Sequence, residues 1–361
     1  MAVYTGINDS SDYFSAKIYT GNGGTQSVTG IGNQPDLVWI KSRVYAEDHQ
    51  LTDSVRGVTK SIQSNLNAAE STIANGLTAF NADGFTVGDK SDFNYNNDNL
   101  VSYNWKAGTT SGLATDGSSN ITPASYSFSN TAKMSIIKWV GTGVDGAYLP
   151  HGLGVVPEFF VIKNLTDAED WVCYHVGLTN ALTVGSNQSF IELNSTAAQQ
   201  TGTGIWYSTV PSSVNVRMAN DNEVNASSDN YIGYFYRSVK GYSKFGSYIG
   251  NDDADNAPFI YTGFKPAFVM IKDRGNIENW FISDDARSPT NPTTVGGGAL
   301  IPNSNNAETT TNAGYKLDML SNGFKPRADA GQINGDGPTY IYCAWAENPF
   351  VTSDSIPTTA R

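Results

Sequence analysis

Short apolar runs separated by polar turns set the pattern of this chain. Residues 37–41 form one such run, which begins after a proline and ends at a lysine. Residues 100–105 alternate instead, so that Val101, Tyr103 and Trp105 face one way. The continuous run predicts a strand covered on both faces, and the alternating run predicts a half-buried strand. We expect the lysine to leave the core with its stem along the apolar surface.

Turn signals recur between these runs roughly every 8–12 residues. Asn22-Gly23 and Asp83-Gly84 are typical of tight hairpins. Helical periodicity does not persist beyond about ten residues anywhere in the sequence. The pattern therefore predicts an all-β protein built from β-sandwich, jelly-roll-like units.

The pattern is written three times. Trp139-Val140-Gly141 recurs as Tyr248-Ile249-Gly250, and other pairs keep the same offset of 109 residues: Lys163 with Lys272, Trp171 with Trp280, Asn194 with Asn303, Asn225 with Asn334. An earlier copy contains the counterparts Lys41, His49, Asn67 and Asn94. Repetition at this length predicts three tandem homologous repeats of about 110 residues, each able to bury a core. The alternative is a single body in which the copies pack around a shared axis.

The predicted organisation has six segments. They are a lead-in at 1–12, copy one at 13–108, a Gly/Ser/Thr-rich linker at 109–129, copy two at 130–238, copy three at 239–350 and a tail at 351–361. The linker composition predicts a flexible or extended segment. The join near 238–241 is short, so copies two and three are expected to lie close together.

Composition removes several functional classes. The net charge is −12 and cations are not clustered, which argues against a nucleic-acid partner and a membrane-surface patch. Apolar runs are too short for membrane insertion, and the first residues lack a signal-peptide pattern. Two cysteines, Cys173 and Cys343, stand where the sister copies have large apolar or aromatic residues, so we expect buried thiols and no disulfide framework.

Aromatic side chains beside amides and carboxylates could bind sugars, because a flat ring packs on a pyranose and polar groups bind its hydroxyls. Trp206 and Tyr207 fall in a loop and are the glycan-contact candidates. The tryptophans at repeat positions are expected to be core: Trp105, Trp171, Trp280 and Trp345.

Oxygen-rich loops raise the question of metal binding. Asp252, Asp253 and Asp255 lie in one such loop and are the candidate Ca²⁺ ligands, although turn chemistry explains the same residues and no cofactor is required. The carboxylate pairs Glu47-Asp48 and Glu169-Asp170 could serve glycan hydrolysis, but neighbours on a strand point to opposite faces, so solvated residues are expected.

Polar residues at strand ends are expected to be structural. Asp53 with Arg56, and Asp284 with Arg287, predict local ion pairs worth at most about 1 kcal/mol at an exposed site. Copy two has His175 and Leu178 at these positions. The three histidines do not show metal-ligand spacing, and a catalytic nucleophile motif is not found.

Three stretches carry a family resemblance. Residues 241–251, residues 261–272 and the ending Tyr340-Ile-Tyr-Cys-Ala-Trp-Ala-Glu-Asn-Pro-Phe350 resemble a repeat of virion proteins from marine tailed bacteriophages, as does Pro150-His-Gly-Leu-Gly-Val-Val-Pro157. The resemblance covers about residues 13–350. It implies a tail or tail-fibre protein, made in the host cytoplasm and exposed on the virion.

These observations give one expectation and two alternatives. We expect a non-enzymatic structural protein of the tail that contacts other virion proteins and presents loops to a host-surface glycan. A homo-oligomer is expected, with a trimer as one candidate number. The alternatives are a capsid decoration or head-fibre protein and a tail-associated glycan depolymerase.

Overall fold

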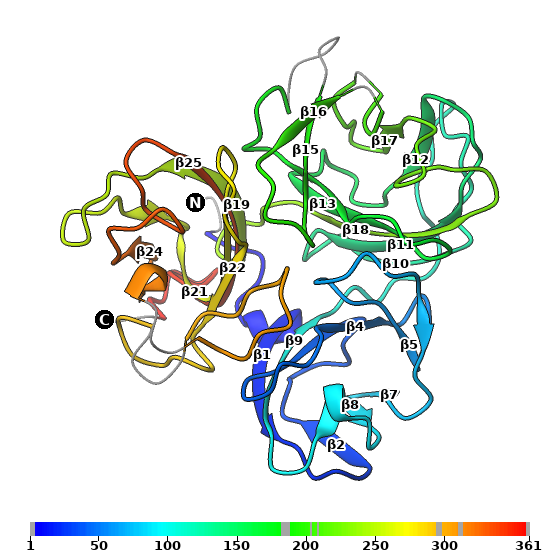
Figure 1. The fold of residues 1–361 in the computed structure, drawn as a ribbon. Helices are drawn as coiled ribbons and strands as arrows, with labels where there is room; N and C mark the ends of the chain where they lie inside the picture. Colours follow the sequence, from blue (N-terminus) through cyan, green and yellow to red (C-terminus); the bar gives the residue numbers. More distant parts are fainter. Residues whose placement is uncertain are drawn as a thin grey trace.

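The computed structural model describes residues 4–181, 188–202, 204–207, 209–293, 298–309 and 313–358. It confirms an all-β fold whose antiparallel sheets gather in three regions, one for each copy (Figure 1). In the part of the chain described, helices are limited to α1 (Ser91–Asn94) and two 3-10 turns, η1 (Ser10–Asp12) and η2 (Ala313–Tyr315). Within the same residues, none of the helices is long and apolar enough to cross a membrane.

The strands follow the predicted spacing. Copy one contains β1 (Phe14–Thr20), β2 (Gln26–Thr29), β3 (Leu37–Ser42), β4 (Gln50–Asp53), β5 (Lys60–Ser61), β6 (Ser71–Thr72), β7 (Leu77–Asn81), β8 (Gly84–Val87) and β9 (Asn99–Trp105). The linker and copy two contain β10 (Ser125–Ser129), β11 (Met134–Val140), β12 (Ala147–Pro150), β13 (Phe159–Asn164), β14 (Val172–His175), β15 (Gln188–Glu192), β16 (Gln200–Gly202), β17 (Asn215–Met218) and β18 (Asn230–Tyr236). Copy three contains β19 (Ser243–Ile249), β20 (Ile260–Tyr261), β21 (Phe264–Asp273), β22 (Phe281–Asp284), β23 (Leu317–Leu320), β24 (Gly323–Pro326) and β25 (Thr339–Pro349).

Each copy has the same four-stranded arrangement. The order is β1-β9-β3-β4 in copy one and β19-β25-β21-β22 in copy three, and β11-β18-β13-β14 repeats it inside a seven-stranded sheet in copy two. A smaller sheet accompanies each, namely β2-β8-β7, β12-β17 and β20-β24-β23. The continuous apolar runs become β3, β13 and β21, which are buried throughout.

One repeated asparagine and one repeated glycine fix the loop that follows the first strand of the four-stranded arrangement in each copy. The buried Asn94 side chain accepts from the N–H of Asn22 and donates to Gly24 and Gly88 carbonyls. Gly21 lies against the carbonyl of Tyr95, where a Cβ would collide. The same contacts recur at Asn225 with Gly141 and at Asn334 with Gly250.

A second repeated asparagine corrects the sequence alignment. Asn194 and Asn303 accept from the N–H of Trp171 and Trp280. In copy one the residue that does this for His49 is Asn65, not Asn67. The assignment of Asn67 was wrong because loop lengths differ in copy one.

The copies close into a ring through one repeated contact. Trp171 of copy two donates its indole N–H to the carbonyls of Gln63 and Leu66 in copy one. Trp280 of copy three donates to Glu192 in copy two. His49, the equivalent residue of copy one, hydrogen-bonds Ile301 in copy three. The contacts therefore describe the alternative arrangement, in which the copies pack around a shared axis.

The axis of the ring is apolar. Trp105, Tyr236 and Trp345 occupy equivalent positions, and their rings meet there: Trp345 lies 5.4 Å from Trp105 and 5.3 Å from Tyr236. A cavity of about 40 Å³ remains between the copies. One buried cluster includes residues of all three copies, so the central part of the core is shared, and two smaller clusters lie within copy three and copy one. The four repeat-position tryptophans are buried, as expected.

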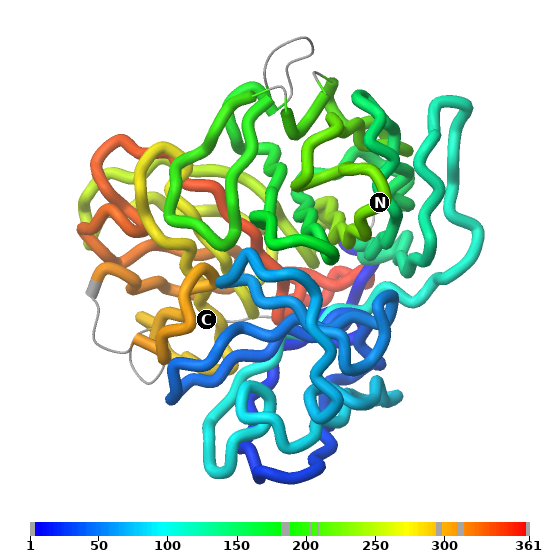
Figure 2. Tube along the Cα trace, turned by 45° about the vertical axis from the view of Figure 1, so that its right-hand side comes forward, coloured from blue at the N-terminus to red at the C-terminus, as the bar shows by residue number. Residues whose placement is uncertain are grey.

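The linker differs from the expectation of a free spacer. It runs from copy one along the side of copy two (Figure 2), and its last part forms β10, which pairs antiparallel with β11. The boundary predicted between 129 and 130 therefore separates β10 from the sheet that it joins.

Candidate functional site

The glycan-contact candidates lie in the smaller sheet of copy two. Trp206 is 2% exposed, and its ring packs edge-on against Phe160 at 4.9 Å. The exposure expected of Trp206 is therefore wrong, because the bridge from Trp206 to Met218 turns its side chain into the core. Tyr207 is half-buried and faces the opposite way.

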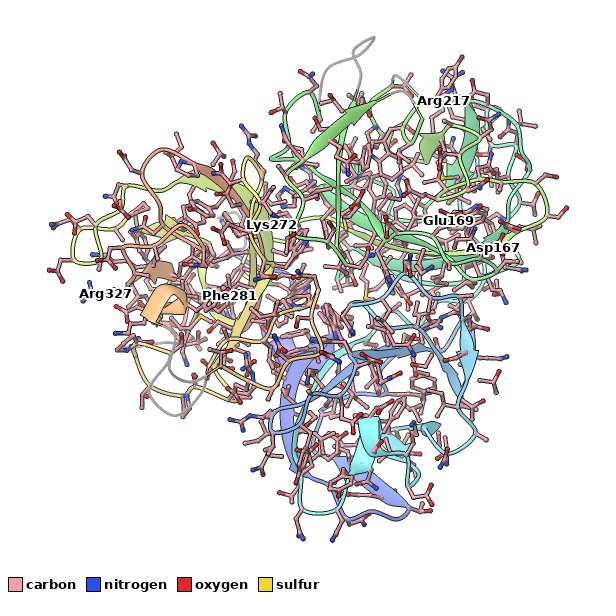
Figure 3. All side chains as sticks on the ribbon, in the orientation of Figure 1. Asp167, Glu169, Arg217, Lys272, Phe281 and Arg327 are labelled. Atoms are coloured by element: carbon pink, nitrogen blue, oxygen red, sulfur yellow. The ribbon has the colours of Figure 1, made fainter. Side chains whose placement is uncertain are left out.

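Tyr207 belongs to a stack with a cation at its centre. The Arg217 guanidinium lies 4.0 Å from the Tyr207 ring centroid and 4.9 Å from that of Tyr148. Tyr148 faces Arg217 across β12 and β17, so the three side chains share one face. Figure 3 places Arg217 at the outer rim of copy two. The stack offers aromatic surface and hydrogen-bond donors to solvent.

The predicted calcium loop is a set of turns. Asp253 accepts hydrogen bonds from Asp255 N–H, Asn256 N–H and the Asn256 side chain, and these bonds hold the pKa of its carboxyl below the usual value. The Asp252 backbone has φ 52° and donates to Asn334. Asp252, Asp253 and Asp255 thus fit turn chemistry, and the structure gathers a different set of carboxylates.

That set lies in copy two. Asp170, Glu192 and Glu223 can place one oxygen each within 4.8 Å of one another. Asp170 accepts from Asn194, and Glu192 accepts from Gln200. We call these three residues the acidic cluster. The neighbouring surface hollow is lined partly by Glu169 and Asp221, and Figure 3 shows Glu169 beside Asp167.

Burial dominates the electrostatics of the cluster. It raises the pKa of Glu223 to about 8, with further increases from Asp221, Glu192 and Asp170. Burial and then Asp170 raise the pKa of Glu192 as well. The raised pKa favours the protonated form of the Glu223 carboxyl. The oxygen donors suit a hard cation such as Ca²⁺, although three carboxylates supply only part of the six to eight oxygens that Ca²⁺ takes.

The positions equivalent to Glu169 and Glu223 keep two carboxyl groups in copy one and one in copy three. In copy one, Glu47 and Asp92 form the pair, and the hydrogen bond that the protonated Glu47 carboxyl donates to Asp92 raises the pKa of Glu47 to about 7. In copy three the counterparts are Glu278 and Gln332. In the predicted pairs Glu47-Asp48 and Glu169-Asp170, the aspartate accepts a hydrogen bond from an asparagine of its own copy. The two acids of each pair therefore have different partners.

A buried lysine lies beneath each of these positions. Lys41, Lys163 and Lys272 are fully buried. Each ammonium donates to carbonyls of the following turn, for example Lys41 to Ser42 at 2.7 Å. Burial lowers the pKa of each lysine to about 8. The expectation that these lysines leave the core was wrong, because the turn carbonyls hold the ammonium inside.

Comparison with known proteins gives a family and no function. A family model described as a domain of unknown function (DUF7483) matches residues 9–349, which include nearly all of the three copies. No curated protein and no solved structure matches the chain.

Proposed function

The chain belongs to the DUF7483 family, and we propose that it is a non-enzymatic structural protein of a tailed-phage virion, a tail or tail-fibre component that presents loops to host-surface glycans. The resemblance of its repeats to marine phage virion proteins supports the proposal. The main structural support is that the polar residues repeated in the copies form hydrogen bonds within the protein.

Polar residues that recur in all copies stabilise the fold. The asparagines at 94, 225 and 334 hold loop entries, and the lysines at 41, 163 and 272 cap turn carbonyls. The residues at 49, 171 and 280 join one copy to the next. Enzymes keep polar groups available for substrate at the reacting centre, whereas these groups already have partners. This use of repeated residues favours a scaffold.

Loops that differ between copies then provide the surface for attachment. Tyr45 and Tyr95 of copy one are 43% and 47% exposed, and their rings meet at 5.0 Å. The copy-two positions are Asp167 and Ala226, so the pair is specific to copy one. This pair and the Tyr148–Arg217–Tyr207 stack are the glycan contacts that we propose, because both present aromatic faces beside polar groups.

Immunogold labelling of intact particles tests the position of the protein. Label on the tail supports the proposal. Label on the head favours a capsid decoration or head-fibre protein, and label on neither contradicts a virion role.

The acidic cluster favours a tail-associated glycan depolymerase as the second candidate. A general acid requires a carboxyl with a raised pKa, and burial raises the pKa of Glu223. A reducing-sugar assay on host polysaccharide, with Glu223→Gln as the control variant, separates the candidates. Turnover that the variant loses would establish the enzyme, and unchanged polymer favours the scaffold.

A further inference from the structure

The outer edge of the main sheet differs among the three copies. In copy two, β10 covers β11 by pairing Ser129, Ser127 and Ser125 with Met134, Ile136 and Lys138. In copy one, the equivalent strand β1 is the last strand of its sheet in the part of the chain described. The chain therefore fills one edge with its own linker and leaves the equivalent edge of copy one open.

Hydrogen bonds at the two ends of β1 show which backbone groups are unpaired. Lys106 donates to Tyr13, and Gly21 donates to Asp98, so odd-numbered residues of β1 bond β9. The N–H and C=O groups of Ala16 and Ile18 consequently point away from the sheet, because bonding alternates along an antiparallel strand. In copy two the equivalent groups belong to Ile136 and Lys138, which β10 covers.

Side-chain exposure agrees with this difference. Ile18 is 44% exposed, and Ala16 and Lys17 are half-buried. In copy two the counterparts of Ala16 and Lys17 are Ile136 and Ile137, which are fully buried. The exposed strand of copy one thus resembles β11 without its cover.

Copy three shows a third state of the same edge. Val239 pairs with Ser243, and Ser238 Oγ accepts from the N–H of Phe245. The short join between copies two and three therefore closes part of the β19 edge. Within the described residues β1 and β19 both end their sheets, but bonds from the preceding segment close part of the β19 edge, and the β1 edge lacks bonds of this kind.

We propose that the β1 edge binds an extended segment of another polypeptide, which adds antiparallel to Phe14–Ile18 as β10 adds to Met134–Lys138. Open edges accept such strands because backbone hydrogen bonds supply affinity and side-chain alternation sets the register. A second copy of this chain fits less well, because full-length antiparallel pairing of two β1 strands places Lys17 opposite Lys17. The partner strand is expected to carry an acidic or aromatic residue there and small polar residues beside it.

The test uses the full chain and a fluorescent peptide of residues 122–131, whose Tyr126 would face Lys17. We expect saturable binding with Kd below about 1 mM, and binding about threefold tighter for the Tyr126→Glu peptide. Ile18→Pro should weaken binding at least tenfold, because it removes an outward N–H that the folded chain does not use. Ile18→Val keeps that N–H and should bind within twofold of the parent chain.

Hydrogen exchange of the parent chain makes the test independent of how the proline variant folds. The amides of Ala16 and Ile18 should exchange at least about 100-fold faster than those of Ile136 and Lys138, and the peptide should slow them. Equal protection in the free chain, absence of saturable binding, or equal binding by a folded Ile18→Pro variant would each overturn the proposal. Dimerisation that Ile18→Pro abolishes would assign the edge to a second copy and overturn it as well.

Discussion

Two of the three junctions in the ring contain a buried ion pair, and the third has a neutral histidine in its place. Tyr234 of copy two donates to Asp53 of copy one at 2.8 Å, and Asp53 also pairs with the fully buried Arg56. Tyr103 of copy one makes the same contact with Asp284 of copy three, beside Arg287. The ion pairs predicted at these positions exist within their own copies, but they are buried, and a tyrosine of another copy hydrogen-bonds the aspartate of each pair.

The third junction changes all of these groups together. His175, Leu178 and Cys343 replace the aspartate, the arginine and the tyrosine. His175 Nδ1 accepts from Gly177 N–H, as Asp53 accepts from Val55, and His175 Nε2 donates to Tyr342 of copy three. Burial lowers the pKa of His175 to about 4, so the ring is neutral. A neutral acceptor preserves the turn without an arginine, which explains the joint replacement.

The largest effect on stability is expected when one charge is removed from a junction that contains an ion pair. Asp53→Ala leaves the buried Arg56 with Glu70, 3.4 Å away, as its carboxylate partner, and should reduce the free energy of unfolding by about 3–5 kcal/mol. His175→Ala at the third junction should cost about 1–3 kcal/mol, because no buried charge loses its partner. Chemical denaturation measures both. Equal losses would contradict the contrast between the junctions.

Replacing the whole polar set should cost less than breaking it. The triple variant Asp53→His, Arg56→Leu, Tyr234→Cys copies the third junction, so it should be at least about 2 kcal/mol more stable than Asp53→Ala. Urea midpoints of the two variants provide the comparison. A triple variant that is less stable than the single one would show that the junctions are not interchangeable.

Removing one of the indole N–H donors that join neighbouring copies should have an intermediate effect on the free energy of unfolding. Trp280→Phe leaves the Glu192 carbonyl without its partner and should cost about 1–3 kcal/mol. Trp171→Phe removes bonds to two carbonyls and should cost more. Thermal melting of both variants checks the order, and a reversed order would argue against the hydrogen bonds as the cause.

The acidic cluster should make stability depend on pH. The folded-state pKa of Glu223 is raised from 4.5 to about 8, so the folded chain binds more protons than the unfolded chain between these values. The stability that Glu223 contributes therefore falls as pH rises through this window. Glu223→Gln should gain about 1 kcal/mol at pH 8, after allowance for solvent screening, and nothing at pH 4. A gain that is equal at both pH values would contradict the assignment.

The smallest effect on stability is expected at the exposed tyrosine pair. Tyr45→Ala should change the free energy of unfolding by less than about 0.5 kcal/mol. Its retention on immobilised host polysaccharide should nevertheless fall. Val144→Ala, at an exposed apolar site in copy two, is the control and should be retained as the parent is. Equal retention of Tyr45→Ala would remove this pair from the proposed contacts.

The sequence was sufficient for the strands, because their patterns are local and occur three times. The junctions could not be predicted in the same way, since Tyr103 and Asp284 are 181 residues apart. An alignment of the copies shows which positions are equivalent, but it does not show which residues touch. The joint change to His175, Leu178 and Cys343 was a signal that these positions meet. The alternation Ser125-Tyr-Ser-Phe-Ser129 likewise indicated a strand, but the surrounding Gly/Ser/Thr composition favoured a linker.

Among the candidate site residues, Tyr207 lies at the surface, and Trp206 does not. The sequence placed both residues in a loop, where strand alternation does not apply, and the bridge from Trp206 to Met218 is what turns the two side chains opposite ways. The acidic cluster was missed because Asp170, Glu192 and Glu223 come from separate segments. Their closeness depends on how the turns of copy two fold together.

Scanning calorimetry tests the closed ring most directly. A core shared by three copies should unfold as one unit, so the calorimetric enthalpy should equal the van't Hoff enthalpy in a single transition. Separate transitions for the copies, or a calorimetric enthalpy near three times the van't Hoff value, would contradict the account.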